Sequence, residues 1–415
     1  MTAIADLGSS ATYLPGVPYE TFAHLRATSP VHRFPEATRK IPGVNGGWIE
    51  STGPGYWAVT RHADVVHVSR HPELFSSWLG GTQIFDPHNQ MELDNFRQMM
   101  LNMDPPEHSK LRRIVQKAFV PRAIERLKES VHENAAEIVD DFANAGGGDF
   151  VEDLAAELPL RVLADLLGVP RDDRHLLFDW SNRLIGSDDP EFGGGDPVQY
   201  AAAFMEMFSY GNNIAEDRRA NPRDDLVSVI ANAEVEGERL SQVEFNMFWM
   251  LLVIAGNETT RNLLSGGTLA LIEFPDQLER LVADRALLPT AIEEMLRYVS
   301  PVIHFRRTAT QDTEVAGQPI AEGDKVVVYY PSANHDGDVF ERPDAFDVGR
   351  TPNEHVAFGV GPHFCLGAHL ARQEIDAMFG LLLDRVPRLA LTGPVERMQS
   401  AFINGIKHLP VEVRG

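Results

Sequence analysis

Residues 358–367 read Phe-Gly-Val-Gly-Pro-His-Phe-Cys-Leu-Gly, and they hold the only cysteine of this 415-residue chain, Cys365. A lone cysteine cannot form an internal disulfide or a multi-cysteine zinc site, so its chemistry is nucleophilic, redox-sensing, haem-ligating or absent. Gly359, Gly361 and Gly367 omit side chains where the backbone would approach a flat partner closely, and they allow backbone N–H groups to point at the sulfur. The pattern favours one thiolate bound to one metal.

Together with Ala368-His369-Leu370-Ala371, this stretch resembles the haem-binding loop of the cytochromes P-450, F-G-x-G-x-H-x-C-x-G. The resemblance covers nearly the whole chain. It implies a mainly α-helical fold with a small β-rich region that encloses haem b, with Cys365 as the iron ligand. A helix expected from about Leu366 would place the sulfur near a helix N-terminus, where partial positive charge favours thiolate.

Two other interpretations of Cys365 are weaker. Free cysteine is among the most buried residue types, so the thiol could be an ordinary core residue. A cysteine protease is disfavoured, because His363 lies only two positions away and no local nucleophile signature is present.

The composition of the chain bounds its class and location. No linker-like segment divides it, so we interpret residues 1–415 as a single domain. A net charge of −23 would repel nucleic acid and anionic membrane surfaces. The longest apolar run, residues 247–255, is far shorter than the roughly 20 residues that span a membrane, and the N-terminus does not resemble a signal peptide. We therefore expect a cytoplasmic protein that binds no nucleic acid and has no membrane span.

The first part of the chain is predicted to be mainly helical. A short helix near 19–28 precedes a strand at 56–60, and Thr60 could cap the next helix, which would end before Pro72. Helical patterns dominate from about 106 to 300, broken by a Gly/Asp/Pro-rich segment at 186–197 that we interpret as a mobile loop.

A long helix and a strand-rich end complete the pattern. Ser241-Gln-Val-Glu244 has the form of a capping box and predicts a helix that runs to about Phe274. After residue 300, short strands are expected around the turn at Gly317 and over 325–330. The tail from 389 to 413 is expected to form further strands with a turn near Asn404-Gly405.

The long helix carries a polar interruption, Ala255-Gly-Asn-Glu-Thr-Thr260, in an otherwise apolar stretch. A glycine inside a helix costs roughly 1 kcal/mol relative to alanine, so its presence needs a reason. A solvent-facing polar turn is the alternative. The resemblance implies an oxygen-binding groove in which Gly256 leaves room for dioxygen, and Glu258 and Thr259 relay protons, as heterolytic O–O cleavage in a dry site requires.

Glu294 and Arg297 lie three residues apart and would share a helix face. Taken alone, this is a common surface pair. The resemblance implies the family's E-x-x-R motif, with Arg350 as the third member of a buried structural network behind the haem. Arginine suits that role because its planar fork can serve two partners.

Four basic residues match positions that would bind the haem propionates: His108, Arg112, Arg307 and His363. His108 and Arg112 are four residues apart and would share a helix face, and charge-assisted hydrogen bonds suit a propionate. For each residue alone, a solvent-exposed base is the alternative interpretation.

The chain lacks a dinucleotide-binding fingerprint, so electrons must come from NAD(P)H through separate proteins, as in family members served by a ferredoxin and a ferredoxin reductase. A basic cluster at 110–128 includes Lys110, Arg113 and Lys117, which would offer a docking site for an acidic ferredoxin. Most such runs are merely solvated helix faces.

The segments that contact substrate in this family contribute mainly apolar residues here, which indicates a hydrophobic substrate that is large for a small molecule, although any core is apolar. The strongest candidates for substrate binding are Ile84, Met99, Leu252, Ala255, Val302, Phe402 and Ile403. The same segments also contain Phe85, Met91, Phe96, Phe178, Phe204 and Met205.

Three runs are similar to actinobacterial members that hydroxylate the terminal carbon of sterol side chains and methyl-branched lipids. They are 101–104, 255–262 and 404–408. Hydroxylation of a terpenoid, macrolide or polyketide is the alternative. His304-Phe305-Arg306 departs from the usual apolar run, and a histidine or arginine near the pocket would argue against a purely hydrocarbon substrate.

The sequence therefore predicts a haem-thiolate monooxygenase that inserts one atom of O2 into an unactivated C–H bond. Cys365 would donate electron density to iron and favour O–O cleavage. A peroxygenase is one rival, and it would not need the Glu258 and Thr259 pair. A haem-binding gas sensor is the other, and no attached output domain supports it.

Overall fold

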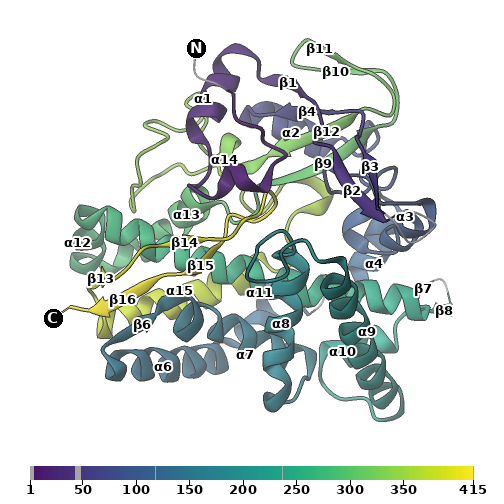
Figure 1. Ribbon diagram of the computed structural model, residues 1–415. Helices are drawn as coiled ribbons and strands as arrows, with labels where there is room; N and C mark the ends of the chain where they lie inside the picture. Colours follow the sequence, from purple (N-terminus) through teal and green to yellow (C-terminus); the bar gives the residue numbers. More distant parts are fainter. Residues whose placement is uncertain (1–3, 43–47, 117, 236, 415) are drawn as a thin grey trace.

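The computed structural model describes residues 4–42, 48–116, 118–235 and 237–414, and within them helices predominate (Figure 1). The helices of the first half are α1 Tyr19–Thr28, α2 His62–Arg70, α3 Gln90–Phe96, α4 Glu107–Gln116, α5 Pro121–Glu125, α6 Lys128–Ala145, α7 Glu157–Leu167 and α8 Arg174–Ile185. Those of the second half are α9 Pro197–Ala220, α10 Leu226–Ala231, α11 Gln242–Glu273, α12 Pro275–Ala283, α13 Leu288–Val299, α14 Tyr330–Ala333 and α15 Ala368–Arg385.

The strands are short and fall mainly at the two ends of the chain. Those before residue 240 are β1 Val31–Phe34, β2 Arg39–Pro42, β3 Trp48–Ser51, β4 Tyr56–Val59, β5 Phe75–Ser76, β6 Gly147–Asp149, β7 Glu234–Val235 and β8 Glu238–Arg239. Those after it are β9 His304–Ala309, β10 Thr313–Val315, β11 Gln318–Ile320, β12 Lys325–Tyr329, β13 Leu389–Leu391, β14 Glu396–Arg397, β15 Ile406–His408 and β16 Pro410–Val413. The expected mainly α-helical fold with a small β-rich region is therefore confirmed.

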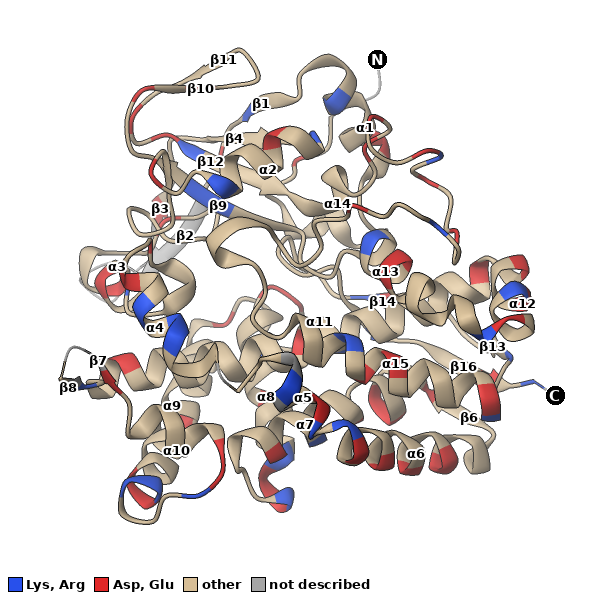
Figure 2. Cartoon of the chain, turned by 180° about the vertical axis from the view of Figure 1, so that it is seen from behind, with Lys and Arg blue, Asp and Glu red and all other residues tan. Residues whose placement is uncertain are grey.

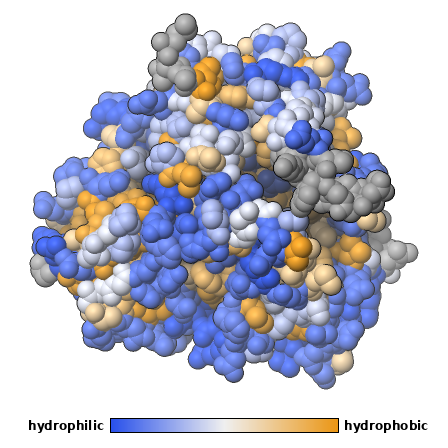
Figure 3. Space-filling view, in the orientation of Figure 1, coloured by the Kyte–Doolittle hydropathy of each residue, from blue (hydrophilic) through white to orange (hydrophobic). Residues whose placement is uncertain are grey.

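The main sheet has the order β1-β4-β12-β9-β5, and it lies in the upper part of Figure 1, away from the helices α6 to α10. β12 pairs parallel to β4 and antiparallel to β9, and β9 also pairs with β5, so β9 occupies an inner position in the sheet. Smaller ladders join β10 to β11 and place β16 between β13 and β6. The face seen in Figure 3 is largely hydrophilic, with separate apolar patches.

α11 organises the helical part. It begins with the expected capping box, in which Ser241 and Glu244 each bond the other's backbone N–H, and it ends at Glu273 before Pro275. The helix is unbroken through Gly256, so the polar run interrupts the apolar stretch of sequence but not the helix itself. It packs against α7, α8, α9 and α13, and it is buried along most of its length.

Two local predictions need correction. Thr60 does not cap α2, because its hydroxyl donates a hydrogen bond to the Pro30 carbonyl oxygen at 2.9 Å, and α2 begins after Arg61 without a side-chain cap. The segment 186–197, which we expected to be a mobile loop, is a series of turns up to Asp196, and Pro197 begins α9; its mobility stays a prediction. Asp189 within it accepts a hydrogen bond from the Gln399 backbone N–H at 2.8 Å and pairs with Lys407 at 3.1 Å.

Candidate functional site

A cavity of about 1000 Å³ lies between α11, the Cys365 loop, β9 and the turn that follows β14. Residues from α11, from the segment 80–102, from the α8–α9 connection and from the C-terminal turn line it. These segments are far apart in sequence, so the fold assembles the site from the whole chain.

Cys365 lines this cavity within a tightly turned loop. Its backbone N–H donates to the Phe358 carbonyl oxygen at 2.9 Å, and the turn at Gly361 has a φ of +78°. A Cβ atom at Gly361 would lie 2.5 Å from the Ser69 carbonyl oxygen of α2, so only glycine fits this close approach.

The ionisation of the free Cys365 thiol differs from our expectation. Burial raises the pKa of the thiol, and the hydrogen bond from the Gly367 backbone together with the positive charge of Arg112 only partly offsets this. Gly367 is the N-cap of α15, so this helix terminus does favour thiolate, but the effect of burial is larger. A bound metal cation would have to stabilise the thiolate.

The four expected propionate ligands come together at the wall beside Cys365, and all four line the cavity. The rings of His108 and His363 have centroids 4.3 Å apart, and Arg112 donates to the Phe364 carbonyl oxygen at 2.8 Å. Arg307, on β9, is 3% exposed.

The electrostatics of this wall fit an anionic group. Burial, reinforced by Arg112 and only partly offset by Asp104, lowers the pKa of His108 to about 4, and burial with Arg307 lowers that of His363 far below its usual range. The buried Nδ1 atom of His108 has no partner among the described residues. A cluster of mutually repelling bases with an unused hydrogen-bonding nitrogen suits the carboxylates of a haem.

On α11, Glu258 and Thr259 both line the cavity. The Thr259 hydroxyl donates to the Ala255 carbonyl oxygen at 3.0 Å. Glu258 is buried, and burial raises the pKa of its carboxyl although the neighbouring Arg261 lowers it. Its Oε1 atom has no partner among the described residues, while Oε2 accepts from Arg261.

Arg261 was missed in the sequence, although its spacing of three residues from Glu258 could have indicated the pair. Its guanidinium donates to the Asn182 Oδ1 atom at 2.8 Å and lies 5.4 Å from the centre of the Phe178 ring. Gly256 also has a packing reason, because a Cβ atom there would lie 2.9 Å from a methyl group of Leu163 on α7.

All seven strongest candidates for substrate binding line the cavity: Ile84, Met99, Leu252, Ala255, Val302, Phe402 and Ile403. Phe85, Phe96 and Phe204 line it as well. Three other residues of the same segments do not. Met91 and Met205 are 71% and 73% exposed, and Phe178 packs beneath Arg261. An apolar residue in one of these segments therefore need not face the cavity.

His304 and Arg306 separate in the structure. His304 lines the cavity, whereas Arg306 does not. Arg306 points to Asp86, at 2.6 Å, and Asp86 also pairs with Lys325 at 2.7 Å. This network joins β9 and β12 to the segment 80–88, part of which forms the cavity wall.

Glu294, Arg297 and Arg350 meet outside the cavity wall. Both carboxylate oxygens of Glu294 accept from Arg297 at 2.8 Å, and Arg350 contacts the same carboxylate at 3.0 Å. Glu294 and Arg297 are completely buried. The remaining Arg297 donors reach the carbonyl oxygens of Asn334, Pro343 and Ala345, so the network joins α13 to the long connection before the Cys365 loop.

Glu374 was also missed. It lies on α15 and lines the cavity, and its Oε2 atom is buried with no partner among the described residues. Burial raises the pKa of this carboxyl to about 8. Neither motif nor spacing in the sequence distinguishes it from the exposed acids nearby.

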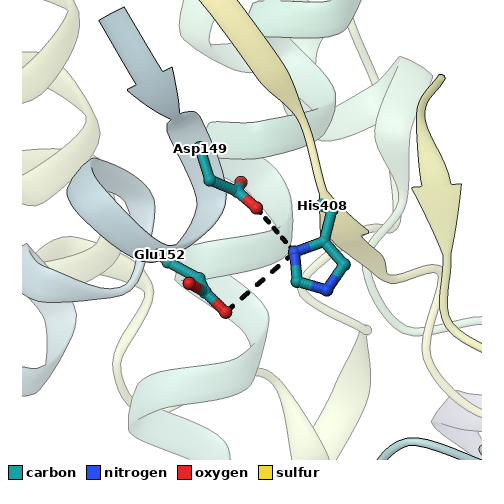
Figure 4. A group of neighbouring side chains, drawn as sticks. All are labelled: Asp149, Glu152 and His408. Atoms are coloured by element: carbon teal, nitrogen blue, oxygen red, sulfur yellow. Dashed lines mark hydrogen bonds and ion pairs between the residues drawn. The ribbon is translucent and has the colours of Figure 1, made fainter. Parts of the chain in front are cut away.

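A second cluster of ionisable groups lies outside the cavity. Asp149, Glu152 and His408 each place one potential ligand atom within 4.8 Å of the others (Figure 4). The two ring nitrogens of His408 already contact carboxylates, Nδ1 with Asp149 at 2.6 Å and Nε2 with Glu191 at 3.1 Å. We explain this cluster as an ion-pair network between the C-terminal strands and the 186–196 segment, and we assign no metal to it.

Comparison with known proteins shows the family. The family model for cytochrome P450 matches residues 196–387. Steroid C26-monooxygenase of Mycolicibacterium smegmatis is 42% identical over 413 residues, which cover 99% of this chain and 94% of that protein. The chain is a cytochrome P450. A methyl-branched lipid omega-hydroxylase of Mycobacterium tuberculosis is also 42% identical to this P450, over 94% of the chain and 90% of that protein.

The solved structures agree. A cytochrome P450 of Mycobacterium marinum in complex with pseudoionone superposes with a TM-score of 0.88 at 42% identity, over 95% of this chain and 94% of that one. This P450 is therefore an oxidoreductase that incorporates oxygen, and its family implies a haem, electrons from redox partners, and O2. Among the described residues, no helix has the length and apolar character needed to cross a membrane.

Proposed function

We propose that this P450 hydroxylates the terminal carbon of a sterol side chain or of a methyl-branched lipid. The observation that carries this proposal is the cavity of about 1000 Å³, in which the haem would occupy the part beside Cys365 and the mainly apolar remainder suits a hydrophobic molecule. The names of two relatives, each 42% identical over nearly the whole chain, support the same substrate class.

The cofactor would be haem b, and the Cys365 sulfur would hold its iron. His108, Arg112, Arg307 and His363 would hold its propionates, which would give the clustered bases the negative charge that they lack. When bound, the haem supplies the activation of dioxygen, and a thiolate ligand favours O–O cleavage.

Glu258 and Thr259 would manage protons in the wall of the cavity. Glu258 is paired with Arg261 through Oε2, and it can take up a proton transiently on Oε1, since burial raises the pKa of its carboxyl. The Thr259 hydroxyl can accept this proton at Oγ1 and release its own hydroxyl proton into the cavity. The apolar neighbours Leu252 and Ala255 would limit the access of bulk water.

The network of Glu294, Arg297 and Arg350 would be structural. It holds α13 against the connection that leads to the Cys365 loop, and a buried network of this kind fixes geometry more than it adds stability. The interpretation of residues 1–415 as one domain, and the location in the cytoplasm, stay predictions.

The electron donor would be a ferredoxin reduced by NAD(P)H through a reductase. Parts of α4 are coloured blue for lysine and arginine in Figure 2, and Arg113 on this helix is exposed. Lys110 on the same helix forms an ion pair with Glu107, and Lys117 lies outside the described residues. Charge-steered docking predicts that reduction by an acidic ferredoxin slows as ionic strength rises.

Reconstitution tests this function. Purified P450 with ferredoxin, reductase and NADH should convert sterols or methyl-branched lipids to products that are hydroxylated at a terminal carbon and carry one oxygen atom from O2. Turnover with hydrogen peroxide alone, and none with the electron-transfer proteins, would identify a peroxygenase. No consumption of reductant with any sterol, branched lipid, terpenoid or macrolide would contradict an enzymatic role and favour a haem sensor.

A further inference from the structure

His304 is a polar side chain in the mainly apolar part of the cavity wall. It is the first residue of β9, it is 2% exposed, and it lines the cavity. Its Nδ1 atom lies 3.0 Å from the Ala401 carbonyl oxygen. Its Nε2 atom is buried and has no partner among the described residues.

The contact with Ala401 fixes which ring nitrogen carries hydrogen. A carbonyl oxygen only accepts, so Nδ1 has to be the donor in this hydrogen bond. Burial lowers the pKa of His304 to about 4, although the Ala401 carbonyl partly offsets the effect, so the ring is neutral near pH 7. Nε2 is therefore a hydrogen-bond acceptor, and leaving a buried acceptor unused costs free energy that an occupant of the cavity could recover.

The ring is also held in place. Its centroid lies 5.7 Å from that of Phe402 and 5.8 Å from that of Tyr329. Val302, two residues earlier, and Phe402 both line the cavity, so His304 is surrounded by the residues that we expect to contact substrate. A fixed acceptor among apolar groups can orient a substrate through one hydrogen bond.

The charges around the cavity add a second constraint. Several carboxylates line it, and those of Asp6, Glu92 and Asp196 accept from the Gly8 backbone N–H, pair with His88 and accept from the Val198 backbone N–H, respectively. Asp86 lines it too, and Arg306 and Lys325 pair with it. Among the described lining residues, the arginines are Arg112 and Arg307, both at the expected haem edge, and there is no lysine. Away from that edge, a substrate carboxylate would meet like charge and would find no arginine or lysine among the described lining residues.

We propose that His304 makes this P450 select an uncharged, hydroxyl-bearing lipid, because the hydroxyl donates a hydrogen bond to Nε2, while a carboxylate is disfavoured. The proposal rests on the proposed function and refines its substrate class. It assigns His304 a role in specificity that Arg306, two residues later but outside the cavity wall, does not share.

Ligand titration of the haem-loaded protein tests this inference through the change in iron spin state. Cholestanol, cholestanone and cholestane share one carbon skeleton and offer a donor hydroxyl, an acceptor ketone or no polar group. The wild type should bind cholestanol about tenfold more tightly than cholestanone, the effect of one hydrogen bond worth roughly 1.4 kcal/mol. In His304→Phe, which keeps a ring but removes both nitrogens, this ratio should fall to about one.

Two further variants keep the test decisive. His304→Gln retains an acceptor and should restore part of the preference for the alcohol. Phe402→Leu changes the same wall without removing a polar group, and it should weaken all three ligands alike. If His304→Phe fails to bind haem, the comparison of alcohol with ketone in the wild type and in His304→Gln still decides the question. Equal binding of alcohol and ketone by the wild type would overturn the proposal.

Charge selection is tested with phytanol, phytanic acid and the methyl ester of that acid. At neutral pH the acid should bind at least about tenfold more weakly than the alcohol, since the described lining holds no arginine or lysine outside the expected haem edge. Tighter binding of the acid would overturn the proposal and leave the monooxygenase function intact if the product still forms. Loss of all oxygen-dependent turnover would instead contradict the proposed function.

Discussion

The Glu258 carboxylate and the Arg261 guanidinium form an ion pair inside the wall of the cavity, with both side chains at most 2% exposed. The pair lies on one face of α11, next to Thr259, and it leaves Oε1 of Glu258 without a partner among the described residues. The acid is therefore held in a fixed place by a residue that does not itself line the cavity.

Substitution of either partner should leave the other charge buried and unpaired. Arg261→Gln and Glu258→Gln are each expected to lower the free energy of unfolding by about 3–5 kcal/mol. The double variant should lose much less stability than the sum of the two single losses, because no unpaired charge remains. Urea unfolding of the four proteins measures this coupling. Additive losses would show that the two side chains do not depend on each other.

Thr259→Ala should uncouple electron consumption from product formation, because the hydroxyl on the cavity side of α11 is lost. Product formed per NADH consumed is expected to fall at least about tenfold, because a positioned proton donor typically accelerates a reaction by a factor of this order or more. The electrons that form no product should appear as hydrogen peroxide. Thr268→Ala is the matched control, since Thr268 lies on the same helix but does not line the cavity. Unchanged coupling in Thr259→Ala would remove this residue from the proton relay.

Arg297→Ala should lose stability and haem together. Removal of the guanidinium leaves the completely buried Glu294 without its main partner, which costs about 3–5 kcal/mol. The control is Arg280→Ala, because Arg280 is 47% exposed and its pair with Asp347 should contribute less than about 1 kcal/mol. Haem content per chain and the denaturant midpoint report the outcome. Normal haem incorporation by Arg297→Ala would refute the structural role.

Glu374 should make stability fall as pH rises. Its pKa is raised from 4.5 to about 8 in the folded protein, so between these values the unfolded chain has released this proton while the folded protein retains it. A raised carboxyl pKa therefore lowers the free energy of unfolding as pH increases, by up to about 1.4 kcal/mol per pH unit within this window.

Glu374→Gln removes this dependence, so its stability relative to the wild type should improve from pH 5 to pH 8. Asp376→Asn, an exposed acid on the same helix, should show no such trend. Urea midpoints across this range provide the measurement. A constant difference between Glu374→Gln and the wild type would mean that Glu374 ionises normally when folded.

Much of the fold could be predicted because its signals are local. The capping box at Ser241 and the stop at Pro275 define α11 within one residue. The positions that depend on a partner across space were less predictable. Thr60 has the chemistry of a helix cap, yet the Pro30 carbonyl competes for its hydroxyl.

The same limit applies to the site. The Cys365 loop and the spacing of Glu294 and Arg297 are contained in short motifs, so the sequence identifies them. Burial of Glu374 and the unused nitrogen of His304 arise only when distant segments pack together. Met91 was misassigned for a related reason, because an apolar side chain in a substrate-contacting segment can still face solvent.

The central claim is that the Cys365 thiolate would bind a haem iron, and the carbon monoxide difference spectrum of the reduced protein tests it most directly. The wild type should be coloured and show the absorption band that is typical of thiolate-ligated haem, and Cys365→Ser should lose that band. A colourless wild type, or an unchanged spectrum in Cys365→Ser, would contradict the account.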